Sequence, residues 1–166
     1  MSTNVALNSE RLGRVTIVPT QDQQRARSIA VVEAFFDALV SKDREKLLSL
    51  WHADGAQEMP YAPEGVPTRV DGQAQLRSFW SAVFDGIADI AFSSIEVRAM
   101  DDPNVVLSQH QGSVKLANGT GYDNRYISVF YLRDGRIDIY REYFDPLVVL
   151  RAWGNSDDLA RRFEQR

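Results

Sequence analysis

The apolar residues in the first half of the chain recur with the period of an α-helix. From Gln21 onward one apolar stripe has spacings of three and four, and its members are Ile29, Val32, Phe36, Leu39 and Val40. Asp43 can cap a second, shorter helix. In a third helix after Gly72, apolar residues occupy i, i+3, i+4, i+7 and i+8: Leu76, Phe79, Trp80, Val83 and Phe84. We therefore expect three helices, with a turn at HADGA (52–56) and short strands around a loop before the third helix.

After residue 86 the apolar period changes to two, which is typical of strands. Four such segments are expected at 90–100, 105–116, 122–132 and 137–145. The sequences between them, DDPN, ANGT and RDGR, are typical of tight turns, so the strands should form an antiparallel meander. A helical turn is expected after Pro146, with a break at Gly154 and a new start capped by Ser156. Helices followed by strands predict an α+β domain whose curved sheet leaves an apolar pocket against the helices.

Composition limits the classes of function. The 166 residues suggest a single domain at 21–166 with a helical C-terminal tail, preceded by a flexible arm at 1–20 that shows no period. The net charge of -4 argues against nucleic acid and anionic membranes as partners. We find no apolar run long enough to span a membrane, and the N-terminal residues do not resemble a secretory signal. The absence of cysteine excludes disulfides and thiolate chemistry and fits the cytoplasm. Two histidines far apart, His52 and His110, do not predict a metal site.

Several short sequences in the second half of the chain carry a resemblance. They are DPN at 102–104, Gly112, GYDNRYISVFYL at 121–132, GRI at 135–137, RE at 141–142, Pro146 and LRAWG at 150–154. Together they resemble the SnoaL-like branch of the nuclear transport factor 2 / ketosteroid isomerase superfamily, and more narrowly the phenazine-biosynthesis A/B proteins. The similarity is good over residues 100–154 and looser over 21–99.

This resemblance implies a fold, an assembly and one functional residue. The fold would be a cone-shaped α+β barrel, with a curved antiparallel sheet wrapped around the N-terminal helices, as in nuclear transport factor 2-like and cystatin-like proteins. The assembly would be a homodimer formed through the sheet, and no metal or organic cofactor is implied. The acid/base glutamate of the phenazine proteins falls on Glu142. Their second assigned residue, a histidine of the third helix, would fall on or near Phe79, and this chain has no histidine in that helix.

Glu142 is also the main candidate from the residues themselves. Strand alternation places it on one face with Tyr140 and Phe144. The expected members of the other face are Ile137, Ile139, Arg141 and Tyr143. If the face with Glu142 lines the pocket, loss of water raises the pKa of the acid toward neutrality and suits it to proton transfer. The alternative is a solvated glutamate, paired with Arg141 or Arg151.

Other polar residues could assist. Tyr126 could donate a hydrogen bond to a developing oxyanion, and Asn124 on the same strand face could orient a water molecule. His110 would be a natural general base if it faced inward. The alternatives are packing for Tyr126, a local turn bond for Asn124 and a polar strand face for His110. For Asp145 we expect a cap or a salt bridge at the helix that follows, and the alternative is a carboxylate turned inward by a bend of the strand end.

Aromatic residues complete the predicted site. The candidates for substrate binding are Phe79, Trp80, Tyr61, Phe144 and Trp51, and the alternative for each is core packing. The sequence thus favours a cofactor-free acid/base enzyme acting on a hydrophobic or aromatic, cyclic small molecule by isomerisation, cyclisation or condensation. The other hypothesis is a dimeric module that binds such a molecule without changing it. Exposed Ile139 and Tyr143 would suit a homodimer interface on the outer face of the sheet.

Overall fold

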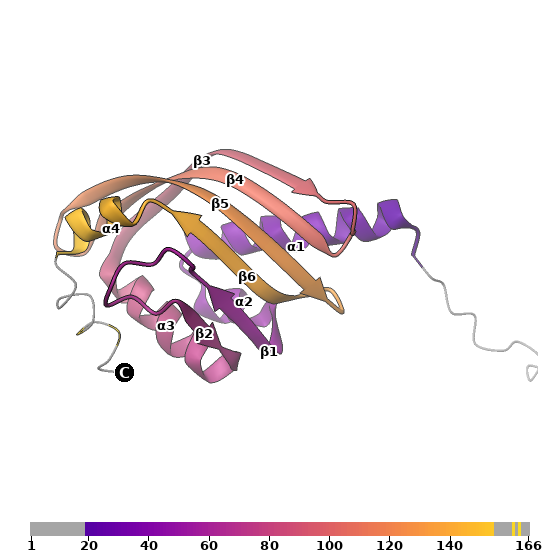
Figure 1. The fold of residues 1–166 in the computed structure, drawn as a ribbon, viewed down its shortest axis with the longest axis horizontal. Helices are drawn as coiled ribbons and strands as arrows, with labels where there is room; N and C mark the ends of the chain where they lie inside the picture. Colours follow the sequence, from indigo (N-terminus) through magenta and orange to yellow (C-terminus); the bar gives the residue numbers. More distant parts are fainter. Residues whose placement is uncertain (1–18, 155–160, 162, 164–166) are drawn as a thin grey trace, which may run out of the picture.

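A curved, open sheet forms the body of the protein (Figure 1). The structure, a computed structural model, describes residues 19–154, 161 and 163. Within these residues six strands run in the spatial order β2-β1-β6-β5-β4-β3. The elements in chain order are α1 (Gln21–Val40), α2 (Arg44–Ser49), β1 (Trp51–Glu58), β2 (Arg69–Asp71), α3 (Gly72–Gly86), β3 (Ile87–Ala99), β4 (Val105–Leu116), β5 (Gly121–Arg133), β6 (Arg136–Phe144) and α4 (Pro146–Trp153).

The three predicted helices are present, and local hydrogen bonds fix where they start. Thr20 and Gln23 form a reciprocal capping box at the start of α1, with N···O distances of 3.3 and 3.0 Å. Asp43 accepts a hydrogen bond of 2.9 Å from the backbone N–H of Lys46 and so caps α2 as expected. No helix in the described ranges is both long enough and apolar enough to cross a membrane.

The predicted turn at HADGA is wrong, because these residues belong to strand β1. β1 pairs in parallel with β6, a contact that links chain segments some eighty residues apart, with Trp51 opposite Ile137. The pairing is irregular between Trp51 and Ala56. A Cβ atom at Gly55 would lie 2.8 Å from the carbonyl oxygen of Ile137, so glycine permits this close approach of two backbones.

The predicted meander of four antiparallel strands, β3 to β6, is confirmed. One prediction about its faces is wrong. Tyr131 pairs with Ile139 and Leu132 pairs with Ile137, so Asp138 is an extra residue that shifts the alternation of β6. Ile137 is therefore fully buried in the core that also contains Tyr140.

Helices α1 and α3 lie against one face of the sheet (Figure 1). A cluster of aromatic rings fills the space between these helices and the sheet. Phe35 of α1 is at its centre, with ring centroids 4.8 Å from Tyr140 and 5.2 Å from Phe130. Short α4 continues from β6, where the side chain of Asp145 accepts a hydrogen bond of 2.9 Å from the N–H of Leu147, as predicted. Gly154 ends α4 as predicted, with a φ of 103°. The predicted cap at Ser156 and most of the predicted arm lie outside the described residues.

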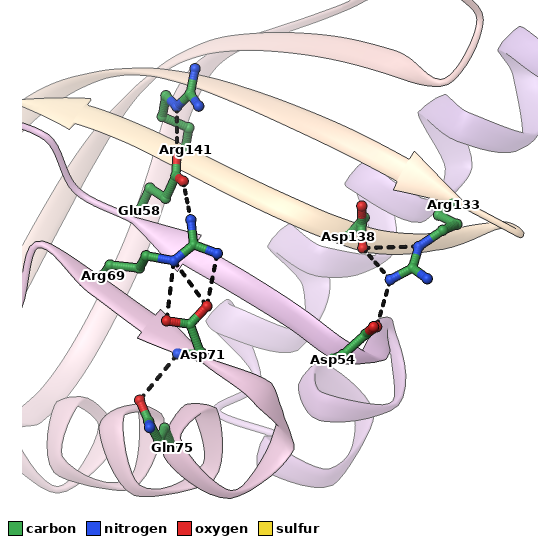
Figure 2. Close-up of polar contacts among 8 residues, drawn as sticks. All are labelled: Asp54, Glu58, Arg69, Asp71, Gln75, Arg133, Asp138 and Arg141. Atoms are coloured by element: carbon green, nitrogen blue, oxygen red, sulfur yellow. Dashed lines mark hydrogen bonds and ion pairs between the residues drawn. The ribbon is translucent and has the colours of Figure 1, made fainter.

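Ion pairs on the surface hold β1 to its neighbours (Figure 2). Glu58 of β1 binds Arg69 of β2 on one side and Arg141 of β6 on the other, the latter at 2.6 Å. Arg69 also bonds Asp71 through its Nε, at 2.9 Å. Ion pairs that remain in contact with solvent are individually weak, so we regard this network as support for the strand order and not as its cause.

Candidate active site

A cavity lies between α3, the sheet and α4. Its volume is about 130 Å³, and most of its wall is apolar. The apolar wall includes Phe79, Phe84, Ile87, Phe92, Val114 and Val149. Such a chamber, with a few inward-facing polar groups, is the usual form of a small-molecule site.

Glu142 of β6 borders this cavity, on the face that strand alternation predicted. Desolvation by burial raises the pKa of its carboxyl group to about 7, while a hydrogen bond from Tyr140 acts in the opposite direction. The hydroxyl of Tyr140 donates this bond to Oε1 at 2.7 Å. With a pKa near neutrality, the carboxyl group can both accept and return a proton at ordinary pH.

Two tyrosines of β5 add hydroxyl groups to the same cavity. Tyr126, a predicted site residue, and Tyr122 both line it, and their hydroxyls are hydrogen-bonded to each other. Trp153 of α4 also hydrogen-bonds to Tyr122. Burial raises the pKa of both tyrosines, so both hydroxyls keep their protons and can donate hydrogen bonds. Tyr122 was not among the predicted site residues, although simple alternation places it on the same strand face as Tyr126.

His110 faces inward but does not border the cavity. Its ring is stacked on Tyr126, with centroids 5.0 Å apart and planes 7° apart. Phe36 and Phe92 contact it edge-on at 4.7 and 5.4 Å. Burial lowers the pKa of His110 to about 4, so the ring is neutral at physiological pH. The geometry suits support of Tyr126 from behind better than the general-base role predicted for His110.

The predicted substrate-binding residues divide into two groups. Phe79, Trp80 and Phe144 line the cavity. Trp51 and Tyr61 do not: Trp51 lies fully buried in the core, and Tyr61 is 66% exposed, with its ring 5.6 Å from that of Tyr143. Trp51 therefore packs within the core, and Tyr61 packs on the surface.

Asn124 also lies outside the cavity lining, because the start of α4 uses its amide group. Its Nδ2 donates to the carbonyl oxygen of Asp145 at 3.0 Å, and its Oδ1 accepts from the N–H of Asp145 at 3.1 Å. Asn124 therefore ties β5 to the junction between β6 and α4. Tyr122 and Tyr126 flank it on the same strand, so this bond also helps to fix their backbone.

Two fully buried polar atoms, on side chains that line the cavity, have no partner within the described part of the chain. They are Oε1 of Gln57 and Nε1 of Trp80, and their side chains are almost completely buried. An unpaired buried polar group costs about 1–3 kcal/mol, so each such atom requires an explanation. Gln57 was not among the predicted site residues, because local patterns do not show that β1 lies beside β6.

A surface cluster could be mistaken for a metal site. Candidate ligand atoms of His52, Asp54 and Asp138 lie within 4.8 Å of one another. The guanidinium group of Arg133 already contacts both carboxylates, at 2.5 and 2.6 Å, and so supplies the positive charge there (Figure 2). We assign no metal to this cluster.

Comparison with known proteins identifies the family. Residues 32–140 match the model of the SnoaL-like domain. The uncharacterized protein YesE of Bacillus subtilis is 35% identical over 132 residues, which cover 78% of this chain and 89% of YesE. An uncharacterized PhzA/B-like protein of Pseudomonas aeruginosa is 30% identical over 126 residues, covering 74% of this chain and 87% of the relative.

The fold also resembles that of solved structures. The Δ5-3-ketosteroid isomerase from a Mycobacterium species superposes with a TM-score of 0.66 at 20% identity, over 74% of this chain and 95% of the isomerase. This likeness shows the fold, and the sequence matches show the family. The chain belongs to the SnoaL-like domain family, its fold is that of the ketosteroid isomerase, and its relatives include an uncharacterized protein of the PhzA/B-like type.

Proposed function

We propose that this protein is a cytoplasmic, cofactor-free acid/base enzyme that moves a proton on a hydrophobic cyclic small molecule. One observation carries the proposal: Glu142 borders an apolar cavity, and burial raises the pKa of its carboxyl group to about 7. Such a carboxyl group is a suitable proton carrier. The likeness to a protein named for ketosteroid isomerisation supports this class of reaction.

The proposed step begins with ionised Glu142 and a ring carbon next to a carbonyl group. The carboxylate takes the C–H proton, and the electron pair of that bond forms an enolate. The enolate oxygen accepts a hydrogen bond from the hydroxyl pair of Tyr126 and Tyr122, which keeps its protons at neutral pH. Protonated Glu142 then returns the proton to the same or another carbon. Isomerisation, cyclisation and condensation can all proceed from this enolate.

The remaining predicted residues take supporting roles in this proposal. Phe79, Trp80 and Phe144 form the walls that hold the ring of the substrate. His110 is a positioning residue, because its stacked ring fixes the plane of Tyr126. The histidine of the phenazine proteins would fall on or near Phe79, so in this proposal the chain uses an apolar contact in that region.

Proton exchange tests the proposal without knowledge of the natural substrate. A panel of cyclic ketones is incubated with the protein in D2O, and loss of the signal of protons next to the carbonyl group is followed by NMR. Wild type should accelerate exchange of at least one ketone, and Glu142→Gln should reduce that rate by about 10²-fold or more. Glu33→Gln, which changes an exposed acid of α1, is the matched control and should keep the wild-type rate.

Undiminished exchange in Glu142→Gln would remove Glu142 from the mechanism. Ketones that bind to wild type without any exchange would favour the second candidate, a non-catalytic, dimeric small-molecule-binding module. The observation on its side is Phe79, because an apolar ring at that position leaves the third helix without the second acid/base residue of the phenazine proteins.

A further inference from the structure

We infer that Phe163 limits the size of the ligand that the cavity accepts. Its ring, together with that of Phe79, separates the cavity of Glu142 from a neighbouring groove. The protein therefore takes uncharged single-ring compounds and excludes longer, two-ring compounds that would extend into the groove. The inference rests on the proposed function in treating this cavity as the active site, but it is tested by binding alone.

The rings of Phe163 and Phe79 are stacked on each other. Their centroids are 5.3 Å apart and their planes are inclined by 14°. Phe79 belongs to the core of α3 side chains, is 8% exposed, and contacts the ring of Trp80 edge-on at 5.6 Å. Phe163 reaches Phe79 from near the C-terminal end of the chain, and its side chain is only partly buried. Phe163 is thus the half of the pair that can be removed with little damage to the core.

The stacked pair borders two different spaces. One is the cavity with Glu142, of about 130 Å³. The other is a groove of about 380 Å³ beside α3, and its lining includes Arg69 and Val70 of β2 and Ala74, Gln75 and Ser78 of α3. Among the described residues, Phe79 and Phe163 alone belong to both linings. The two rings are therefore the wall between the cavity and the groove.

The volume of the cavity sets the limit on ligand size. About 130 Å³ is close to the volume of protein cavities that accept benzene, so one six-membered ring fits. A second ring needs space that the cavity does not provide while Phe163 is stacked on Phe79. Loss of the Phe163 ring would join the cavity to the groove, and a longer ligand could then occupy both.

Charge narrows the class of ligand further. Among the described residues that line the cavity, Glu142 is the only acid, and none is lysine, arginine or histidine. An anionic ligand would be buried there without a counter-charge, which is strongly unfavourable. The groove contains Arg69, but Glu58 and Asp71 already bind its guanidinium group (Figure 2). We therefore expect uncharged ligands on both sides of the wall.

The test compares cyclohexanone with 4-phenylcyclohexanone, an uncharged ketone that carries a second ring, by NMR titration. Wild type should bind 4-phenylcyclohexanone at least tenfold less tightly than cyclohexanone. Phe163→Ala should bind 4-phenylcyclohexanone at least tenfold more tightly than wild type does, because the second ring then buries apolar surface in the groove. Phe163→Leu, which keeps an apolar side chain in the wall, should show a smaller gain.

Two further changes separate the wall from its surroundings. Arg161 is a described residue near Phe163 that lines neither the cavity nor the groove, so Arg161→Ala should keep both affinities of wild type. Ala74→Trp places a large ring in the groove from an exposed position of α3. Combined with Phe163→Ala, it should remove the gain for 4-phenylcyclohexanone and leave the affinity for cyclohexanone at the level of Phe163→Ala.

Equal affinity of wild type and Phe163→Ala for 4-phenylcyclohexanone would overturn the inference. A gain that Ala74→Trp does not remove would also overturn it, because the second ring would then lie outside the groove. Failure of the proposed function looks different. If Phe163→Ala gains the two-ring ketone but no ketone exchanges its protons, this inference stands and the acid/base proposal fails. If cyclohexanone exchanges its protons but Phe163→Ala gains nothing, the acid/base proposal stands and this inference fails.

Discussion

The hydroxyl of Tyr140 donates a 2.7 Å hydrogen bond to Oε1 of Glu142, its neighbour two residues along β6 on the same face. The Oγ of Ser128 in turn lies 3.4 Å from the hydroxyl of Tyr140 and donates to it. This short chain of buried groups fixes the carboxyl group in the cavity wall. It also opposes the effect of burial, because a hydrogen bond to the ionised carboxylate favours ionisation.

Removal of this donor should raise the pKa of Glu142 above its value of about 7. In Tyr140→Phe the carboxylate loses its partner, while desolvation remains. The pH at which proton exchange reaches half of its maximal rate should increase by about one unit, since a hydrogen bond to a charged group is worth about 1.5–3 kcal/mol and one unit corresponds to about 1.4. The measurement is the pH–rate profile by NMR.

Tyr143→Phe is the matched control for this change, because Tyr143 is the neighbouring tyrosine of β6 and does not line the cavity. Its midpoint should equal that of wild type. A midpoint in Tyr140→Phe that is unchanged, or that moves to lower pH, would show that the hydrogen bond does not govern the titration of Glu142.

Glu142 and His110 should have opposite effects on the pH dependence of stability. Burial raises the pKa of Glu142 from 4.5 to about 7, so the folded state loses stability as pH rises through this range. Burial lowers the pKa of His110 from 6.5 to about 4, so the folded state loses stability as pH falls through that range. Between pH 4.5 and 6.5 the two groups together bind about one proton in either state, and their contributions cancel.

Variants that remove only one of the two groups should reveal the pH dependence of stability that cancels in wild type. Relative to wild type, Glu142→Gln should lose stability as pH falls from 6.5 to 4.5, and His110→Phe should lose it as pH rises over the same range. Each change should be on the order of 2–3 kcal/mol, because one pKa unit corresponds to about 1.4 kcal/mol. Urea denaturation at several pH values measures both. If the stability of wild type, Glu142→Gln and His110→Phe depended on pH in the same way, Glu142 and His110 would not both be neutral and buried in the folded state.

Gly112 makes room for the rings of the site. A Cβ atom there would lie 3.0 Å from Cε2 of Tyr126 and 3.3 Å from Cε1 of Phe92. Gly112→Ala should therefore displace Tyr126 and lower the free energy of unfolding by about 1–3 kcal/mol, the usual cost of overpacking. The rate of ketone proton exchange should also fall at a temperature where the variant remains fully folded, so that the loss is not due to unfolding.

Gly121→Ala is the control for Gly112→Ala, since the nearest atom to a Cβ there is a backbone oxygen at an ordinary 3.5 Å. It should leave the exchange rate near that of wild type. Equal rates in wild type and Gly112→Ala would show that the position of the Tyr126 ring does not matter for proton transfer.

Local patterns in the sequence predict the meander and the strand face that Glu142 shares with Tyr140 and Phe144, but they leave open whether that face lines the pocket. Both depend on alternation and turn residues, which act over a few positions, and Tyr140, Glu142 and Phe144 keep their alternation in the structure. The parallel pairing of β1 with β6 could not be predicted in this way. It joins segments far apart in the chain, and its irregular residues, including Gly55, resemble a turn.

The missed part of the site follows from the same limitation. Gln57 is a site candidate only once β1 is known to lie beside Tyr140, because a lone glutamine has no distinguishing pattern. Asn124 and Tyr61 are candidates by residue type alone. Backbone groups of Asp145 satisfy the side-chain amide of Asn124. Tyr61 lies on the surface and therefore outside the cavity. Residue chemistry identifies candidates, and long-range packing decides which of them meet.

The outer face of the sheet remains the predicted dimer interface. Ile127 of β5 is 47% exposed and pairs across the sheet with Tyr143 of β6, on the face away from the cavity. A two-fold partner could cover these side chains, so light scattering after size exclusion should give about twice the chain mass of 18.8 kDa. Ile127→Arg should shift the protein toward a single chain because it places a charge in the interface. Leu147→Arg, at a position of α4 that is 56% exposed, should leave the mass unchanged. A wild-type mass near 18.8 kDa would refute the dimer, and it would leave the cavity of each chain as the complete site.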